Sequence, residues 1–369
     1  MENNIKNSGN SYKNENPDEI LKDEIDVSDL DMTLNGFNEF RITDTTDIKP
    51  PIPVITINGE IISTEGNITT ISGASKSGKS SFAYILIAGA ISPDGNIDGL
   101  SALKVEPNTS GKAVLHFDTE QSRYDHKINL MAILRRSNIE TCPEYFRSYN
   151  IRDWGVEGSI DVIRTICDLA SKQFGGIHLI VIDGAADLLY DVNDPTQSNA
   201  LVKKIGDIAN DFYAPVIVII HTNPNSDKER GHLGSQFQRK SESVLFVKNQ
   251  FVKNYGDVSS LEPKLLRKAW RNNIPQVQFI YNKEKGYHDE FARTFDEDVI
   301  TEKCSIENTK KLCLDVFQDK KKLKYGTIKD QIMKITRKGE GTAKSRFAQM
   351  RLHKMIKQDE DKFWILYEE

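Results

Sequence analysis

Several features that would place this chain outside the ordinary globular proteins are missing from its sequence. The longest apolar run extends only from Phe82 to Ile91, about half of what a membrane-spanning helix needs. The first residues are polar, where a secretory signal would be apolar. We therefore expect neither a membrane-embedded nor an exported protein, and no membrane as a partner.

Cysteine is also scarce. The 369 residues include four cysteines, Cys142, Cys167, Cys304 and Cys313, and no two of them form a CxxC pair. This spacing argues against a disulfide framework and against a zinc site. We expect reduced thiols and a cytoplasmic location.

The net charge of −5 conceals an uneven distribution of charged residues. Residues 1–50 carry 5 basic and 12 acidic side chains, whereas residues 306–369 carry 16 basic and 10 acidic side chains. An acidic head and a basic tail therefore flank a nearly neutral middle. The head also lacks hydrophobic periodicity, so we predict a largely disordered acidic tail over residues 1–49.

From residue 50 onward, short β-branched runs alternate with helical patterns. Four buried strands are predicted, at 67–72, 113–118, 178–183 and 216–221. Crossover helices are predicted at 80–91, 160–174 and 198–212. Near-continuous apolar runs are typical of strands that are buried on both faces of a parallel sheet. The pattern predicts an α/β domain over residues 50–300, with a mainly parallel sheet covered by helices.

One motif in this domain indicates a specific ligand. A GxxxxGK[ST] sequence lies between the first predicted strand and the helix that follows it. The predicted phosphate-binding residues are those of the motif and the next serine, namely Gly73, Ala74, Ser75, Lys76, Ser77, Gly78, Lys79, Ser80 and Ser81. Backbone N–H groups of such a loop bind nucleotide phosphates, helped by the partial positive charge of the helix N-terminus. We expect Lys79 to neutralise the terminal phosphates of ATP and Ser80 to ligate Mg²⁺.

Acidic residues end two further strands. Asp183 ends the most apolar of the predicted strands, and we predict it as the second Mg²⁺ ligand. Gly184 comes next, so this strand lacks a second carboxylate. Glu120 lies just past the strand that ends at Asp118, at the edge where ligands of open α/β sheets bind. We therefore predict Glu120 as the general base for an attacking water, with Asp118 as the alternative.

The last of the four predicted strands ends in His221-Thr222-Asn223. A polar side chain at this position can bind the terminal phosphate or the attacking water, and can report hydrolysis to the loop that follows. We predict His221 in this role.

The phosphate loop, the strand ends HFDTE and VIDGAADLL and the tripeptide HTN together resemble the RecA-like ATPase family. Among its branches, the sequence most resembles the RepA-type hexameric replicative helicases and related ATPases of plasmids and mobile elements. The resemblance covers residues 52–285. It implies a RecA-like P-loop core and a homo-oligomeric ring, usually a hexamer, with ATP held between neighbours and single-stranded DNA in the centre.

In such rings an arginine of the next subunit stabilises the charge on the transferred phosphoryl group. The segment from Lys268 to Asn272 is similar to the strand segment that supplies this arginine. We predict Arg271 for the role, with Lys268 beside it. Lys268 and Arg271 are separated by one residue more than in the helicase pattern. Arg230 and Arg267 therefore remain alternatives for the role of the trans-acting arginine.

A long polar stretch, 223–236, follows His221 directly. It is predicted to be a DNA-contacting pore loop, in which Lys228 and Arg230 bind phosphates, or else a flexible surface loop. Gln236 and Gln238 both resemble the glutamine that couples this loop to the γ-phosphate, and the sequence does not distinguish between them.

Residues 301–369 predict a small separate domain. Three helices, at 309–317, 327–336 and 342–355, precede a hairpin that ends near Tyr367. This order resembles a winged helix. Lys344, Arg346 and Arg351 make the third helix basic, which favours binding of duplex DNA over a protein contact. This helix has two apolar stripes, Ala343-Phe347-Met350 and Ala348-Leu352-Met355. The sequence therefore does not decide which face of the helix points outward.

These observations predict a Mg²⁺-dependent ATPase whose activity is coupled to DNA. The resemblance implies a helicase or DNA translocase that acts in replication or transfer of a plasmid or mobile element. The main alternative is an ATP-dependent DNA-binding regulator or recombination factor without unwinding activity. A DNA-binding adaptor that uses nucleotide only to switch its assembly is a non-enzymatic alternative.

Overall fold

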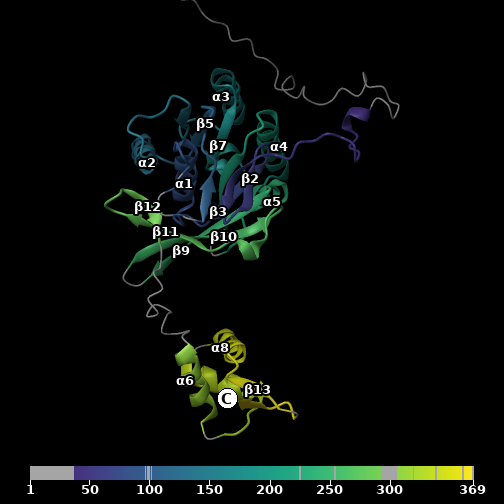
Figure 1. The fold of residues 1–369 in the computed structure, drawn as a ribbon, viewed down its shortest axis with the longest axis vertical. Helices are drawn as coiled ribbons and strands as arrows, with labels where there is room; N and C mark the ends of the chain where they lie inside the picture. The colour runs from purple at the N-terminus through teal and green to yellow at the C-terminus, as the bar shows by residue number, and fades with distance from the viewer. Residues whose placement is uncertain are drawn as a thin grey trace, which may run out of the picture. The chain divides into compact units, whose positions relative to one another are not determined.

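We describe the protein from a computed structural model. It describes residues 37–291, apart from 96, 98, 99, 101, 224, 225, 253 and 254, and residues 306–367, apart from 319, 337, 338 and 360 (Figure 1). Most of the expected acidic tail, and Cys304, lie outside these ranges. The chain divides into two compact units, Met1–Pro51 and Ile52–Glu369. The first unit contains a short 3-10 turn, η2 (Asn38–Phe40).

A large mixed sheet is formed by residues 68–290. Its strands are β3 (Ile68–Gly73), β5 (Ala113–Asp118), β6 (Phe146–Asn150), β7 (Ile177–Asp183), β8 (Val216–His221), β9 (Ser243–Val252), β10 (Gly256–Leu266), β11 (Val277–Asn282) and β12 (Tyr287–Glu290). Within the described residues the strand order is β12-β11-β10-β9-β3-β8-β7-β5-β6. All pairs from β9 to β6 are parallel. The pairs from β9 to β12 are antiparallel.

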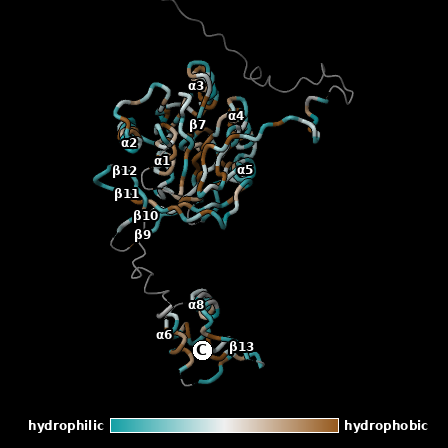
Figure 2. The backbone as a smooth tube through the Cα atoms, viewed as in Figure 1, coloured by the Kyte–Doolittle hydropathy of each residue, from teal (hydrophilic) through white to brown (hydrophobic). Residues whose placement is uncertain are grey.

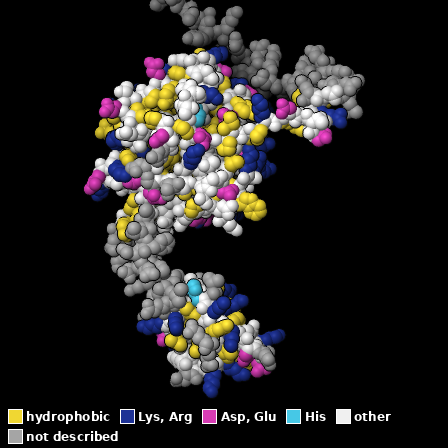
Figure 3. Space-filling model, in the orientation of Figure 1, with side chains coloured by type: hydrophobic (Ala, Val, Ile, Leu, Met, Phe, Trp, Pro, Cys, Tyr) yellow, Lys and Arg dark blue, Asp and Glu magenta, His cyan; other side chains and the backbone are white. Residues whose placement is uncertain are grey.

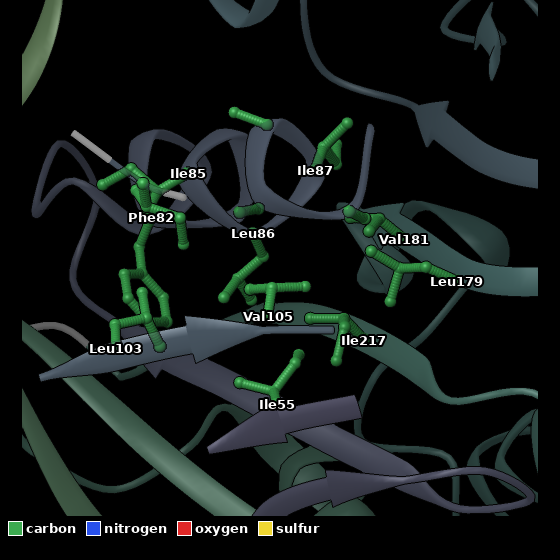
Figure 4. Packing of buried hydrophobic residues seen from close by; sticks show 14 of the residues in the cluster. Ile55, Phe82, Ile85, Leu86, Ile87, Leu103, Val105, Leu179, Val181 and Ile217 are labelled. Atoms are coloured by element: carbon green, nitrogen blue, oxygen red, sulfur yellow. The ribbon is translucent and has the colours of Figure 1, made fainter. Parts of the chain in front are cut away.

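Helices cover both faces of this sheet (Figure 1). They are α1 (Lys79–Ile91), α2 (Arg123–Arg136), α3 (Ser159–Phe174), α4 (Pro195–Asp211) and α5 (Gly231–Lys240). A small antiparallel sheet of β1 (Pro53–Ile57), β2 (Glu60–Thr64) and β4 (Leu103–Val105) packs with α1. Figure 4 shows side chains of α1, among them Phe82 and Leu86, beside Ile55 and Val105 of this small sheet.

Alternate strand residues fill two hydrophobic cores, one on each face of the sheet. Leu179 and Val181 of β7 pack in the core that contains α1, whereas Ile180 and Ile182 pack in the core that contains α3 and α4. All four are fully buried, which explains why β7 appears in the sequence as one continuous apolar run. Figure 2, which colours the backbone by hydropathy, shows this hydrophobic interior. The predicted α/β fold with a mainly parallel sheet is confirmed.

The structure corrects two predictions about local structure. The polar stretch after β8 is not a loop up to Gln236, because α5 begins at Gly231 and buries Leu233 and Phe237 one helical turn apart. Arg271 does not lie on a strand, because β10 ends at Leu266 and Arg271 begins a short 3-10 turn, η4 (Arg271–Asn273).

Residues 306–367 form three helices and a two-stranded sheet. These are α6 (Ile306–Phe317), α7 (Tyr325–Thr336), α8 (Glu340–Leu352), β13 (Ile356–Gln358) and β14 (Trp364–Leu366). The side chains of Ala343, Phe347 and Met350 belong to the hydrophobic core of residues 306–367. This stripe therefore faces inward and Ala348 faces solvent. The element order matches the expectation, while its assignment as a winged helix stays a prediction.

Candidate functional site

The predicted phosphate loop connects β3 to α1. Gly78 precedes α1 with a φ of 96°, a left-handed conformation that glycine adopts without strain. A Cβ atom at Gly78 would also collide with the Ser259 hydroxyl. Gly73 meets a similar limit, since a Cβ there would collide with the Val247 carbonyl. Gly78 is therefore required by its left-handed backbone, and Gly73 by the close approach of the β9 backbone.

A cavity of about 370 Å³ opens over this loop. Its lining includes the second half of the motif together with the three strand-end residues that were predicted, namely Lys76, Ser77, Gly78, Lys79, Ser80, Ser81, Glu120, Asp183 and His221. Ala74 and Ser75 line an adjoining cavity, which also contains Lys76 and Ser77. Gly73 is the last residue of β3. The structure thus brings the predicted nucleotide-binding and catalytic residues of the core together, except for Arg271.

The sheet order explains this convergence. From β3 through β8 and β7 to β5, neighbouring strands are parallel, so their carboxyl ends meet at one edge. Lys79, His221, Asp183 and Glu120 each follow or end one of these strands. Strand β8, which carries His221, lies between the strand of the phosphate loop and the strand of Asp183.

His221 bridges the lysine and the glutamate. Its Nδ1 lies 3.3 Å from Lys79 Nζ, and its Nε2 lies 2.9 Å from Glu120 Oε1. An ammonium group only donates hydrogen bonds, so Nδ1 accepts and Nε2–H donates to the carboxylate. Lys79 also donates to the Ala74 carbonyl at 2.8 Å. One neutral histidine tautomer therefore connects the phosphate-binding lysine to the expected base.

The charges in the cavity affect one another. The hydrogen bond from His221 lowers the pKa of Glu120, and the charge of Lys79 acts in the same direction. Burial lowers the pKa of Lys79, although the carboxylates of Glu120 and Asp183 oppose this shift. Glu120 is therefore ionised at neutral pH and able to accept a hydrogen bond from water.

Asp183 has the environment of a cation ligand. It is only 1% exposed, and neither carboxylate oxygen has a hydrogen-bond partner among the described residues. Burial raises the pKa of Asp183 to about 7, and the nearby Ser80 hydroxyl opposes the rise. A buried carboxylate beside a serine hydroxyl fits Mg²⁺, which keeps water and phosphate oxygens as its other ligands. Within the described ranges, no group of three or more His, Cys, Asp or Glu could hold a metal ion by itself.

Asp118, the alternative base, is fully occupied by internal contacts. Its Oδ1 accepts the backbone N–H groups of Glu120 at 2.9 Å and of Gln121 at 3.0 Å. Its Oδ2 lies 2.9 Å from His126 Nδ1, and the whole residue is buried. Since no oxygen of Asp118 lines the cavity, Glu120 is the better placed of the two carboxylates. Nothing in the local sequence pattern pointed to His126.

Gly184 explains why β7 carries only one carboxylate. Its φ is 97°, and a Cβ atom there would collide with the Thr119 hydroxyl and lie 3.0 Å from Glu120 Cγ. The Thr119 hydroxyl lies 3.0 Å from the Asp183 carbonyl and 2.8 Å from Asp187 Oδ2. The end of β5 therefore occupies the space into which a side chain at position 184 would extend.

The loop after β8 is anchored by Glu229, which the sequence analysis missed. This carboxylate is 5% exposed. It accepts a hydrogen bond from the Ser72 hydroxyl at 2.9 Å and pairs with Lys264 Nζ at 2.7 Å. The Gln238 amide also donates to it. Because Ser72 directly precedes the phosphate loop, the loop after β8 is connected to that loop by side-chain contacts.

Glu120 and His221 also line a second cavity, of about 620 Å³. Exposed residues from three other segments contribute to it, namely Arg152, Trp154, Asp187 and Arg230. Trp154 is 41% exposed, so an indole ring and two guanidinium groups are accessible next to the expected base. Lys228 is exposed in the loop that carries Arg230. No motif in the sequence marks Arg152 or Trp154.

The candidates for the trans-acting cation differ in their local contacts. Lys268 pairs with Glu242 at 2.7 Å, and Glu242 is 2% exposed, so this lysine has a structural contact. Arg267 donates to the Arg239 carbonyl at 2.5 Å. Arg271 donates to the Lys264 carbonyl from an exposed turn. The predicted role of Arg271 in a neighbouring subunit's site stays a prediction.

Two of the three predicted DNA-binding residues of α8 are exposed. Lys344 and Arg351 are exposed, whereas Arg346 is partly buried and donates to Gln349 at 3.1 Å. Lys344 lies 3.2 Å from Glu340, and the Arg351 guanidinium lies 5.4 Å from the centre of the Trp364 ring. Figure 3 shows lysine and arginine side chains spread over the visible face of residues 306–367.

The glycine-rich loop before α1, the parallel strand order and the buried Asp183 together define a nucleotide-binding domain of the P-loop class. A family model described as an AAA domain matches residues 37–227, which is more than half of the chain. The chain therefore belongs to the AAA domain family, and its core is a P-loop ATPase domain. No curated protein matches the chain. The described residues contain no helix with the length and hydrophobicity required to span a bilayer.

Proposed function

We propose that the protein is a Mg²⁺-dependent ATP hydrolase that couples hydrolysis to movement or remodelling of DNA. The observation that carries the hydrolase part is the His221 bridge, which joins Lys79 to Glu120 over the phosphate-loop cavity. A phosphate-binding lysine, an ionised carboxylate and a buried cation ligand are the parts that phosphoryl transfer to water requires.

Each residue has a separate task in this proposal. Lys79 neutralises the terminal phosphates, while Ser80 and Asp183 would hold Mg²⁺, which supplies charge stabilisation when it is bound. Glu120 accepts a proton from the attacking water, and the Nε2–H of His221 fixes its carboxylate in position. His221 ends β8, so the loop that begins at Thr222 is attached directly to a residue of the phosphate site.

Two features support DNA as the partner. In the core, the second cavity combines Trp154 with the guanidinium groups of Arg152 and Arg230. Proteins that bind single-stranded DNA without sequence preference use aromatic rings to stack bases and cations to bind phosphates. In residues 306–367, the exposed Lys344 and Arg351 on α8 favour contact with a duplex backbone.

The assembly is proposed to be a homo-oligomeric ring, most simply a hexamer, in which Arg271 acts on the neighbour's nucleotide. Its support is the resemblance to RepA-type hexameric helicases and the position of Arg271 on an exposed turn, where a second subunit can reach it. The same resemblance favours a helicase or translocase in replication or transfer of a plasmid or mobile element.

One experiment tests the core of the proposal. ATP hydrolysis is measured with and without single-stranded DNA while the oligomer is sized in the same buffer. Stimulation by DNA together with a ring-sized particle supports a motor. Intact ATP binding without hydrolysis, or hydrolysis that ignores DNA, contradicts the coupling. A strand-displacement assay then separates a helicase from the alternative, a DNA-binding regulator or recombination factor without unwinding activity.

A further inference from the structure

The phosphate-loop cavity extends beyond the residues that the hydrolase proposal uses. One part is lined by the motif with Glu120, Asp183 and His221. The rest is lined by residues of the antiparallel part of the sheet, Asn249, Asp257, Ser259, Tyr281 and His288. Four different strands, β9 to β12, therefore contribute to a portion of the cavity that no phosphate contact requires.

This portion contains an accessible aromatic surface. Tyr281 is 53% exposed although it lines the cavity. It lies directly opposite His288 in the antiparallel pair of β11 and β12, and the two ring centres are 5.4 Å apart at 67°. His288 in turn lies 5.9 Å from the buried Phe279 ring, at 76°. Two successive edge-to-face contacts thus fix the orientation of the Tyr281 ring.

The charge of this surface suits a neutral planar ligand. Burial lowers the pKa of His288 to about 4, and the nearby charge of Arg136 acts in the same direction. The imidazole is therefore neutral at physiological pH. The polar residues beside it, Asn249 and Asp257, are exposed and supply amide and carboxylate oxygens that can accept hydrogen bonds.

The surface also has space next to it. A smaller cavity of about 80 Å³ shares Ser81, Tyr281 and His288 with the phosphate-loop cavity. Its other lining residues include Tyr84 of α1 and Tyr287 of β12. The aromatic surface therefore continues between the first helix and the last strands of the sheet, away from the phosphate loop.

We propose that Tyr281, supported by His288, is the stacking surface for the nucleobase, and that Asn249 and Asp257 accept hydrogen bonds from the ribose hydroxyls. This inference rests on the proposed nucleotide binding at the phosphate loop and assigns the nucleoside end of the ligand. All four residues lie after residue 227, outside the segment that the AAA domain model matches.

The proposal has a consequence for specificity. Stacking distinguishes poorly between bases, because every base has a π-face. The site therefore binds ATP and GTP with dissociation constants within roughly tenfold of each other, unlike a site that reads the base edge with paired donors and acceptors.

Direct binding separates the two ends of the cavity. Calorimetry with ATP and with inorganic tripolyphosphate, both with Mg²⁺, is applied to the full chain and to Tyr281→Ala, Tyr281→Phe and Lys79→Ala. The alanine variant should weaken ATP roughly 10- to 100-fold and leave tripolyphosphate binding unchanged, while the phenylalanine variant keeps both. Lys79→Ala should lose both ligands. Retained tripolyphosphate binding also shows that the alanine variant is folded.

The control is Tyr255→Ala. Tyr255 is 56% exposed, lies in the turn between β9 and β10, and packs on Phe291 with ring centres 5.0 Å apart. The Tyr255→Ala variant should bind ATP with the same affinity as the unchanged protein. Unchanged ATP affinity in Tyr281→Ala, or an equal loss of tripolyphosphate, overturns the stacking assignment while leaving the hydrolase proposal intact. Failure of the unchanged protein to bind either ligand overturns both.

Discussion

The carboxylate of Asp118 holds His126 with one oxygen and the backbone of Glu120 with the other. His126 Nδ1 lies 2.9 Å from Oδ2, and the Glu120 N–H lies 2.9 Å from Oδ1. The Ser148 hydroxyl lies 2.8 Å from His126 Nε2 and so links β6 to this contact. The backbone that presents the expected base is therefore fixed by a buried polar network, which needs all its members to stay paired.

We expect His126→Ala to reduce the turnover number between about tenfold and 100-fold, because a small displacement of the base is costly in the transition state. The dissociation constant for ATP should stay unchanged, since His126 does not line the phosphate-loop cavity. Single-turnover hydrolysis and calorimetry give the two values. The matched control is His178→Ala, which removes a 2.8 Å contact to the Glu106 carbonyl near the start of β7. Equal turnover in the two variants would contradict a positioning role for His126.

Lys79→Ala and Glu120→Gln should separate binding from hydrolysis. The first removes the cation that meets the phosphates, so ATP binding is lost. The second keeps the shape of the side chain and its contact with His221 but cannot take a proton, so ATP still binds and hydrolysis falls by roughly 10²- to 10⁴-fold. Nucleotide binding and phosphate release are measured on the same preparations. Normal turnover of Glu120→Gln would exclude Glu120 as the base.

The role of Arg271 can be tested by mixing subunits. An arginine that acts on a neighbour's nucleotide is worth roughly 10³- to 10⁵-fold in turnover, so rings made only of Arg271→Ala should be inactive. Mixed rings that also contain Glu120→Gln subunits should recover part of the activity, because some interfaces then combine an intact base with an intact arginine. Arg230→Ala and Arg267→Ala, at the two alternative positions, are mixed in the same way, and only the arginine that acts in trans should show this recovery. Inactivity of the mixture at every ratio would show that Arg271 acts within its own subunit, and full activity of rings made only of Arg271→Ala would show that it has no role in hydrolysis.

The stability of the protein should fall in mild acid because of His116. Burial lowers its pKa from 6.5 to about 4, with the neighbouring His126 acting in the same direction. Between these pH values His116 binds a proton in the unfolded chain but not in the folded chain. The free energy of unfolding therefore decreases as the pH falls, and the decrease is complete below about pH 4.

His116→Phe should weaken this dependence. The replacement keeps a ring beside His126, which lies 5.3 Å away, and Ser148 keeps its contact with His126. The shift corresponds to about 3 kcal/mol, so the difference in unfolding free energy between pH 7.5 and 4.5 should shrink by up to that amount. Urea unfolding at both pH values measures it. The same pH dependence in both proteins would contradict the assignment.

The parallel core could be predicted from the sequence because its strands are buried on both faces. The expected strands of the sheet agree with β3, β5, β7 and β8 to within one residue at each end. The antiparallel extension was not recognised, because β9 begins buried but is exposed over residues 249–251 and so lacks a continuous apolar run. Periodicity identifies a strand only where the burial pattern is regular.

The residues of the phosphate site were predictable for a similar reason. Parallel strands end at the same edge, so Asp183, Glu120 and His221 had to converge on the loop that contains Lys79. The supporting residues were not predictable, since their contacts join distant parts of the chain. Ser72 and Glu229, for example, are 157 residues apart. Neither a motif nor a local period marks such a pair.

Gly184 limits how this active site can change over evolutionary time. A carboxylate at position 184 would require the Thr119 side chain to be smaller, and Thr119 contacts the backbone of Asp183 and Gly184. A lineage that moved the proton acceptor from the end of β5 to the end of β7 would therefore need coordinated replacements at both positions. A side chain added at position 184 before the change at Thr119 would overlap the Thr119 hydroxyl, so the order of the two replacements matters.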